Sequence, residues 1–213
     1  MIDFYTFNFP DGHQVAIMLE ELGMPYKSHM VDLTKGENFS PKFEKISPNH
    51  TIPAIVDHEG PEGKPVRVFE AGAILLYLAQ KSGRFLGINP ISSLETSQWL
   101  MLILSGLAPF AREFLLEKNR GGPYEQLGFE GRDLSLLEAK IVRHVSALDF
   151  RLREYPYLAK SYSIADMSGI SWIQALQHRG CISVDDYVGV RNWYNRMNNR
   201  QPVRQGLELL EEN

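Results

Sequence analysis

The chain has 213 residues, of which 44% are hydrophobic, and it carries 22 Lys and Arg against 26 Asp and Glu. This apolar fraction suffices for the buried core of one large domain or two small ones. The net charge of −4 is spread without runs, which excludes the basic surface that a nucleic acid or an anionic lipid would require.

The N-terminal sequence and the number of cysteines indicate the cellular compartment of the protein. Met1 leads directly into the strand-like IDFYTF, so we expect no export signal, and no uninterrupted apolar stretch approaches a membrane-spanning length. Cys181 is the only cysteine in the sequence and cannot form an internal disulfide. We therefore expect a cytoplasmic protein with no membrane and no nucleic acid among its partners.

The first 83 residues mix strand and helix patterns. Strands are expected at residues 2–6, 26–32, 54–57 and 66–69, and helices in the segment ending at Gly23 and at residues 41–46 and 70–82. An early β-α-β step needs a crossover, whereas the HEGPEGKP segment between the last two strands marks a hairpin turn. The order therefore predicts one mixed sheet with helices on its faces, an α/β domain of thioredoxin-like architecture over residues 1–83.

The rest of the chain has helical patterns after a short break. Residues 84–91 carry turn residues and little periodicity, so they are the expected linker before a second domain at 92–213. Ser92 and Glu95 form a capping-box pattern that opens its first helix, and Pro109 should kink or break that helix. Further helix signals are the apolar stripe Leu137, Ile141, Val145, Leu148 and Leu152 and the capping pairs Ser163 with Asp166 and Ser183 with Asp186. The predicted second domain is an all-helical C-terminal bundle.

The segment ISPNHTIPAIVDH (residues 46–58) places Pro53 directly before an apolar strand. A proline is tolerated at the first residue of a strand because it donates no ladder hydrogen bond, and most bonds before proline are trans. In a thioredoxin-like order, a cis bond here would instead turn the main chain of Ile52 toward an open cleft. Its N–H and C=O would then be able to pair with the main chain of an extended peptide ligand.

The segment FEAGAILLYLA (residues 69–79) starts a helix at Glu70 and Ala71, directly after the fourth strand. The first N–H groups of a helix have no intrahelical partner and carry the positive end of its dipole, which favours a ligand carboxylate at Ala71 and Gly72. A carboxylate at Glu70 would hold an adjacent ammonium, so the pair suits the head group of an α-amino acid. The alternative is that Glu70 only caps the helix.

Several motifs in register resemble the glutathione transferase family: IPAIVDH followed by FEAGAILLYLA, the capping segment YSIADMSGISW, and a domain boundary near residue 90. The likeness covers nearly the whole chain. With MIDFYTFNFPDGHQVAIMLEEL and KGENF added, the motifs are most similar to the bacterial Nu class, whose members reduce disulfides with glutathione. The resemblance implies glutathione as co-substrate, a homodimer and a role in detoxification.

The resemblance also assigns roles to residues. Ile52 would pair with the cysteinyl main chain of glutathione, and Glu70 with Ala71 would take its γ-glutamyl head. Asn38 would approach the glycyl end, where Lys35 and His50 could assist; a solvated loop position is the alternative for these two. The predicted glutathione-binding set is Lys35, Asn38, His50, Thr51, Ile52, Pro53, Glu70 and Ala71.

The chain departs from the family at the start of the first helix. Transferases place a Tyr, Ser or Cys there that stabilises the glutathione thiolate, whereas NFPDGH (residues 8–13) contains none of them. Phe9 stands where the Nu class usually supplies a hydroxyl, and Asp11 stands where it usually has Asn. An ionised Asp11 would raise the pKa of the thiol by repulsion, or it could cap the helix instead. Stabilisation would then fall to Asn8, Thr6 and the helix N-terminus, so Asn8, Asp11 and Thr6 are the catalytic candidates.

Other predictions concern affinity, the second substrate and metals. Ala71 replaces the usual Ser of the family, and losing one hydroxyl should weaken glutathione binding by about 1 kcal/mol. The candidates for contact with the second substrate are Phe9, Phe110, Arg112 and Phe114, with helix packing as the alternative. The histidines show no paired spacing suited to zinc, so no metal site is expected.

Two functions remain open on these grounds. The first is an enzyme that uses the thiolate of bound glutathione as a nucleophile toward small electrophiles or glutathionyl disulfides. The second is a non-catalytic glutathione-binding or partner-binding module that has kept the fold and lost its thiol-activating residues. Disulfide exchange needs a bound thiolate and an open cleft more than a shaped pocket. Retention of Ile52-Pro53 and Glu70 argues for ligand binding in both cases.

Overall fold

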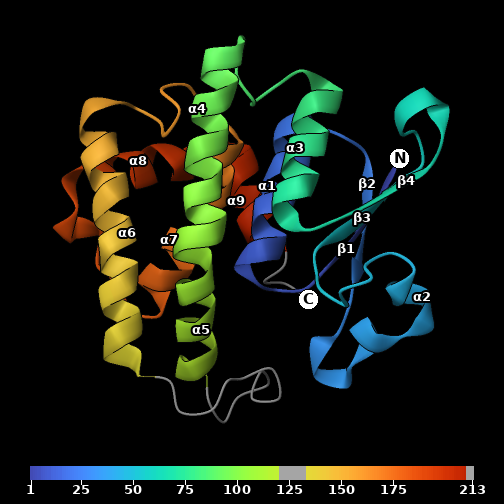
Figure 1. The fold of residues 1–213 in the computed structure, drawn as a ribbon, viewed down its shortest axis with the longest axis horizontal. Coiled ribbons are helices and arrows are strands. Elements are labelled where there is room, and N and C mark those ends of the chain that lie inside the picture. Colours follow the sequence, from blue (N-terminus) through green and yellow to red (C-terminus); the bar gives the residue numbers. More distant parts are fainter. Residues whose placement is uncertain (120–132, 210–213) are drawn as a thin grey trace. The chain divides into compact units, whose positions relative to one another are not determined.

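A computed structural model describes residues 1–119 and 133–209 of the chain, and they cluster into two compact units. The first unit is Met1–Gly83 together with the C-terminal helix α9 (Gln201–Glu208). The second unit lies within Arg84–Arg200. Figure 1 shows a mixed α/β arrangement in the first unit and helices throughout the described part of the second.

The first unit is built on a four-stranded sheet with the order β2-β1-β3-β4 (Figure 1). β1 (Ile2–Thr6) runs parallel to β2 (Tyr26–Met30) and antiparallel to β3 (Ala54–Asp57), which pairs antiparallel with β4 (Val66–Phe69). The other elements of the unit are α1 (Pro10–Leu22), η1 (Leu33–Lys35), η2 (Glu37–Phe39), α2 (Pro41–Glu44), η3 (Pro61–Gly63), α3 (Ala71–Ser82) and α9. α1 supplies the crossover that a parallel pair requires. The predicted thioredoxin-like architecture is confirmed.

The core of the first unit lies between the sheet and its long helices. Side chains of β1 alternate between buried and half-buried, as the period of a strand dictates. Phe4 and its partner Ile55 on β3 are fully buried. They pack in a core with apolar residues of α1 and α3, among them Val15, Ile17, Leu19, Ile74, Leu75 and Leu78.

The last helix departs from the predicted domain division. α9 packs closely along α1, and a Cβ placed on Gly206 would lie 2.5 Å from the main-chain nitrogen of Ile17. Such an approach needs a residue without a side chain. The prediction placed residues 92–213 together in the helical domain, whereas α9 clusters with the first unit. A helical period in sequence does not tell which neighbour a helix packs against.

The second unit begins with one long helical run. It consists of α4 (Pro90–Met101), a π-helical segment η4 (Leu102–Leu107) and α5 (Ala108–Lys118). Pro109 therefore does not break the run, because the wider π turn before it accommodates the missing donor and the proline ring. Asn89 and Ser92 form the capping box of α4, so the predicted box of Ser92 with Glu95 is wrong.

The run from Pro90 to Lys118 is long and apolar enough to cross a membrane by length and composition. The expectation concerned an uninterrupted apolar stretch, and polar or charged residues such as Ser105, Arg112 and Glu113 interrupt this run. Its most apolar window is 44% buried inside the protein, and core helices of soluble proteins pass the same test. One face of this run belongs to the core, since its fully buried residues include Leu100, Ile103, Leu107, Ala111 and Phe114.

The remaining helices of the unit are α6 (Leu134–Glu154), α7 (Ile164–His178), η6 (Val184–Asp186) and α8 (Val188–Asn198). The predicted capping pair at α7 is confirmed, since the fully buried Asp166 accepts hydrogen bonds from the main chain and hydroxyl of Ser163, both at 3.0 Å. The predicted pair at Ser183 opens only the short η6. The N-terminus of α8 is capped instead by Asp149 of α6, which accepts from the N–H of Gly189 at 2.7 Å. An all-helical second unit is thus observed over its described residues.

Candidate functional site

The candidate site of the first unit lies at one end of its sheet. Tyr5 pairs with Ala54, and Ala54 pairs on its other side with Phe69. This register brings together the end of β1, the start of β3 and the end of β4. The Ile52-Pro53 and Glu70-Ala71 pairs therefore lie beside each other, next to the segment that leads from β1 into α1.

Ile52 presents its main chain at this end of the sheet. The bond to Pro53 is cis, as the sequence predicts. The side chain of Ile52 packs against a buried cluster of Val31, Phe43, Ile46 and Ala54. Within residues 1–119 and 133–209, neither the N–H nor the C=O of Ile52 has a hydrogen-bond partner. An extended peptide can thus pair with this residue as an added strand would.

Glu70 and Ala71 form the second part of the site. Glu70 is the N-cap residue of α3, its φ of 66° lies in the left-handed region, and its exposed side chain makes no capping hydrogen bond. A non-glycine residue in that region is strained, which is common at ligand sites. In the described part of the chain, the N–H groups of Ala71 and Gly72 have no partner. The structure therefore does not support the alternative in which the Glu70 side chain only caps the helix.

The residues predicted to contact the glycyl end of glutathione are not all exposed to a ligand. Asn38 is only 5% exposed, and its Nδ2 donates to the carbonyl of His50 at 2.9 Å. The exposed Lys35 has its ammonium 2.8 Å from Asp32, and this hydrogen bond raises the pKa of Lys35. Thr51 is exposed. The Nδ2 of Asn38 thus faces His50 and not solvent, while its buried Oδ1 has no hydrogen-bond partner among the described residues.

The segment between β1 and α1 holds the catalytic candidates. Thr6 is fully buried and its hydroxyl donates to the carbonyl of Phe7 at 3.4 Å, so its predicted role at the thiol is corrected to a core position. Asn8 is half-buried. Asp11 is 8% exposed and lies in the first turn of α1, where the helix dipole favours a carboxylate. Phe9 is the N-cap residue of α1 and makes no side-chain cap.

Two polar residues of α1 with buried side-chain atoms were not predicted. His13 has a buried Nε2 without a hydrogen-bond partner, and burial lowers the pKa of His13 to about 4. Gln14 is fully buried, and neither its Oε1 nor its Nε2 has a partner among the described residues. The only sequence signal for either is a polar pair at the start of an otherwise apolar helix. His13 is therefore neutral near pH 7 and brings no positive charge to this segment.

The candidates for the second substrate that lie in the helical unit are packed against its helices. The ring of Phe110 lies 5.9 Å from that of His144, with the Lys140 ammonium 4.6 Å from its centroid. The guanidinium of Arg112 lies 5.6 Å from the Trp172 ring. Phe114 has no exposed surface, so it is a core residue and its predicted contact with substrate is wrong. Phe110 and Arg112 keep accessible surface and stay predictions.

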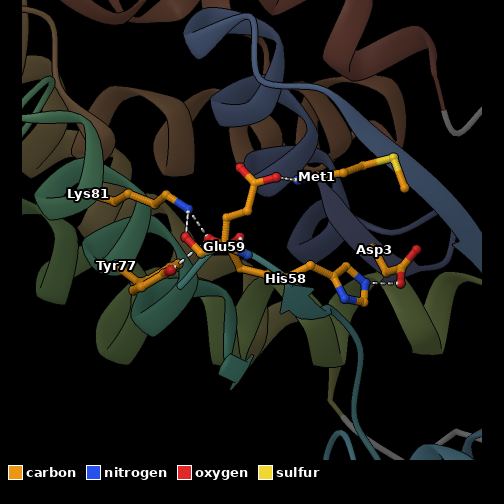
Figure 2. Close-up of polar contacts among 7 residues, drawn as sticks. Met1, Asp3, His58, Glu59, Tyr77 and Lys81 are labelled. Carbon is orange, nitrogen blue, oxygen red and sulfur yellow. Dashed lines mark hydrogen bonds and ion pairs between the residues drawn. The ribbon is translucent and has the colours of Figure 1, made fainter. Parts of the chain in front are cut away.

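At the end of the sheet opposite Ile52, polar side chains form hydrogen bonds with one another (Figure 2). The buried Asp57 accepts hydrogen bonds from Tyr77 at 2.7 Å and from Lys81, which joins β3 to α3. Asp3 of β1 accepts from His58 at 2.7 Å. Over the described ranges, no group of three or more His, Cys, Asp or Glu residues is arranged to hold a metal ion. This end therefore fixes the sheet, while the Ile52 end keeps main-chain groups open.

Comparison with known proteins decides the family. Residues 10–81 match the family model described as glutathione S-transferase, N-terminal domain. Over 212 residues the chain is 38% identical to the disulfide-bond oxidoreductase YfcG of Escherichia coli K12, and the match covers 97% of this chain and 94% of that relative. The chain belongs to the glutathione transferase family. The resemblance predicted from the motifs is confirmed.

Solved structures of glutathione transferases support the same assignment. A family member from Pseudomonas fluorescens with two glutathione molecules bound has a TM-score of 0.88 and 32% identity, covering 97% of this chain and 92% of that one. A glutathione transferase from Pseudomonas putida with one glutathione disulfide bound per subunit has a TM-score of 0.88 and 31% identity, covering 98% and 91%. In this glutathione transferase, the open main chain of Ile52 and the N-terminus of α3 stay the predicted glutathione-binding features.

Proposed function

We propose that this glutathione transferase binds glutathione at Ile52-Pro53 and Glu70-Ala71 and uses its thiolate to cleave small glutathionyl disulfides. The observation that carries the proposal is the unpaired main chain of Ile52 beside an uncapped helix N-terminus, all within the described residues. The first feature suits the cysteinyl main chain of glutathione, and the second suits its charged head group. Together they provide for the whole backbone of a tripeptide.

Charge complementarity orients the head group. The γ-glutamyl end of glutathione carries a carboxylate and an ammonium on one carbon. The carboxylate takes the N–H groups of Ala71 and Gly72, where the dipole of α3 is positive. The ammonium takes the exposed carboxylate of Glu70. Charge-assisted hydrogen bonds of this kind are the strong ones, so this end supplies much of the affinity.

The chemical step is thiol-disulfide exchange. The thiolate of bound glutathione attacks the glutathionyl sulfur of a mixed disulfide, the old S–S bond breaks as the new one forms, and the leaving thiolate takes a proton from water. Glutathione is oxidised to its disulfide and the substrate thiol is released reduced. Asn8 and the N-terminus of α1 stabilise the attacking thiolate, while Asp11 opposes it.

Two relatives support disulfide exchange over conjugation. YfcG and YghU of E. coli are both named disulfide-bond oxidoreductases, and YghU is 33% identical to this chain with 73% of its own length covered. The start of α1 contributes no hydroxyl from residues 8–13, and exchange tolerates a weaker activator because the disulfide carries a good leaving group. Conjugation to electrophiles, the detoxifying reaction, is the slower activity on this proposal.

One experiment separates the proposal from the alternative of a non-catalytic module. The purified protein is titrated with glutathione by calorimetry, then assayed with a small glutathionyl mixed disulfide and with a chloronitrobenzene. We expect binding heat and faster turnover of the disulfide than of the electrophile. Absence of binding heat contradicts the proposal. Binding without turnover of either substrate establishes the module instead.

A cytoplasmic homodimer completes the proposal. α4 and the residue before its cap expose an apolar stripe on the helical unit, Ile88, Ile91, Leu94 and Met101, with exposed fractions of 99%, 80%, 61% and 44%. Contiguous apolar surface of this kind marks protein interfaces. A cytoplasmic location fits a reaction that consumes reduced glutathione. Light scattering tests the dimer, which Leu94→Glu should dissociate.

A further inference from the structure

The main chain just before Ile52 is held by two buried polar side chains. The hydroxyl of Ser47 donates to the carbonyl of Thr51 at 2.8 Å, and Nδ2 of Asn38 donates to the carbonyl of His50 at 2.9 Å. Ser47 is fully buried and Asn38 is 5% exposed. Two successive carbonyls are thus fixed by side chains that are inaccessible to a ligand.

The Ser47 bond acts on a group that matters for recognition. The carbonyl of Thr51 and the N–H of Ile52 belong to the same planar peptide group and point in opposite directions. Fixing the carbonyl toward Ser47 therefore fixes the N–H on the other side. That N–H is one of the two groups that the proposed function assigns to the cysteinyl main chain of glutathione.

A reciprocal contact holds Asn38 in place. The Nδ1 of His50 donates to the main-chain carbonyl of Asn38 at 3.0 Å, while the Asn38 side chain donates back to the carbonyl of His50. His50 has a φ of 57°, and its N–H donates to the carbonyl of Ser47 at 2.9 Å. Nδ1 is the donor in this contact because a main-chain carbonyl can only accept.

We propose that Ser47 and Asn38 are positioning residues that aim the Ile52 N–H at the cysteinyl main chain of glutathione. The inference rests on the proposed function and goes beyond it, since neither side chain touches the ligand. Losing either hydrogen bond frees the peptide groups before Ile52 to rotate. Binding must then restore their orientation, so affinity falls while the bound thiolate reacts as before.

The test compares two buried serines. Ser47→Ala removes a hydroxyl that donates to a carbonyl beside the site. Ser171→Ala removes an equally buried hydroxyl that donates at 2.9 Å to the carbonyl of Ser168 in α7. We expect Ser47→Ala to raise the Kd and KM for glutathione about fivefold with kcat unchanged at saturation, and Ser171→Ala to change neither. Thermal unfolding of both variants measures their stability.

A second pair of variants serves in case Ser47→Ala does not fold. His50→Asn keeps a donor at the position of Nδ1 and tolerates a positive φ, whereas His50→Gln moves the donor one atom further out. We expect His50→Gln to bind glutathione about threefold more weakly than His50→Asn does. A direct ligand contact by Nε2 would reverse this order.

The outcomes separate the two proposals. If the wild type gives no heat with glutathione, the proposed function fails and the positioning role falls with it. If the wild type binds but Ser47→Ala loses no more affinity than Ser171→Ala, the positioning role alone is overturned. A drop in kcat with an unchanged KM also overturns it, because that pattern belongs to a group acting on the thiolate.

Discussion

The recognition segments around Ile52 and Glu70 differ from the activation segment, residues 8–13, in what they ask of the sequence. On the proposed function, recognition relies on the main chain of Ile52, on N–H groups of α3 and on one carboxylate. Activation in this family relies on one particular side chain, and here the segment offers Phe9 and Asp11. Main-chain groups survive substitution of the residues that carry them, whereas a hydroxyl or a thiol does not. A site can therefore keep its ligand while its chemistry weakens.

The two regions differ in charge as well. The recognition segments combine the positive end of α3 with the negative Glu70, which matches a zwitterionic head group. The activation segment also has a helix N-terminus, but Pro10 at its first position has no N–H and Asp11 brings a negative charge. His13, with its pKa lowered to about 4 by burial, supplies no compensating cation. On the proposed function, we therefore expect thiolate stabilisation to be weaker than ligand recognition.

Glu70→Gln tests the recognition side and has the largest expected effect. It removes the negative charge facing the ammonium of glutathione while keeping the shape of the side chain. A charge-assisted hydrogen bond is worth about 2 kcal/mol, so the Kd from calorimetry should rise about 30-fold. Glu62→Gln is the control, since Glu62 is also exposed and has a φ of 56°. Equal affinities of the two variants would remove Glu70 from the site.

The contrast between these regions also shows which structural features can be predicted from the sequence. The strands, the cis bond at Pro53 and the helix start at Glu70 are local signals, carried by period-2 patterns and by one proline or acid beside them. The burial of Asn38 and Ser47 is not local, because it depends on chain segments meeting around Ile52. The same holds for α9, whose packing on α1 depends on Gly206, and for Phe114, whose apolar character suits a core and a pocket equally.

The charge state of the activation segment is tested by the pH dependence of stability. The pKa of His13 falls from 6.5 to about 4 on folding, so the unfolded chain takes up a proton first as the pH drops. The contribution of His13 to the free energy of unfolding is complete above pH 6.5 and is lost as the pH falls from 6.5 to about 4. Because His13 keeps some exposed surface, we expect a loss of roughly 1–2 kcal/mol. Urea unfolding across this range measures it.

His13→Gln removes the titrating group and should flatten that profile. His144→Gln is its control in the helical unit, where the half-buried His144 donates from Nδ1 to the carbonyl of Lys140 at 2.8 Å. If His13→Gln leaves the profile of unfolding free energy unchanged, the pKa of His13 does not fall on folding and stays at 6.5. The activation segment would then take up a positive charge as the pH drops below that value, and the contrast in charge would fail there.

Asp11→Asn tests whether the carboxylate opposes the thiolate. Removing the charge should lower the pKa of the bound glutathione thiol and raise the rate below that pKa by up to about tenfold. The measurement is the pH profile of kcat with a glutathionyl mixed disulfide. Asp3→Asn changes a carboxylate at the other end of β1 and should leave the profile in place. A rate that stays equal or falls in Asp11→Asn shows that the carboxylate does not act on the thiol.

Ala71→Ser has the smallest expected effect and links both sides of the comparison. The added hydroxyl can donate to the γ-glutamyl carboxylate next to the N–H groups of α3, a gain of about 1 kcal/mol or fivefold in Kd. Ala73→Ser adds a hydroxyl at an exposed position of the same helical turn and should not change affinity. Because the substitution acts only on recognition, kcat should stay constant while KM falls. A change in kcat would mean that the head group and the thiol are coupled, so that recognition and activation cannot be treated as independent parts of the site.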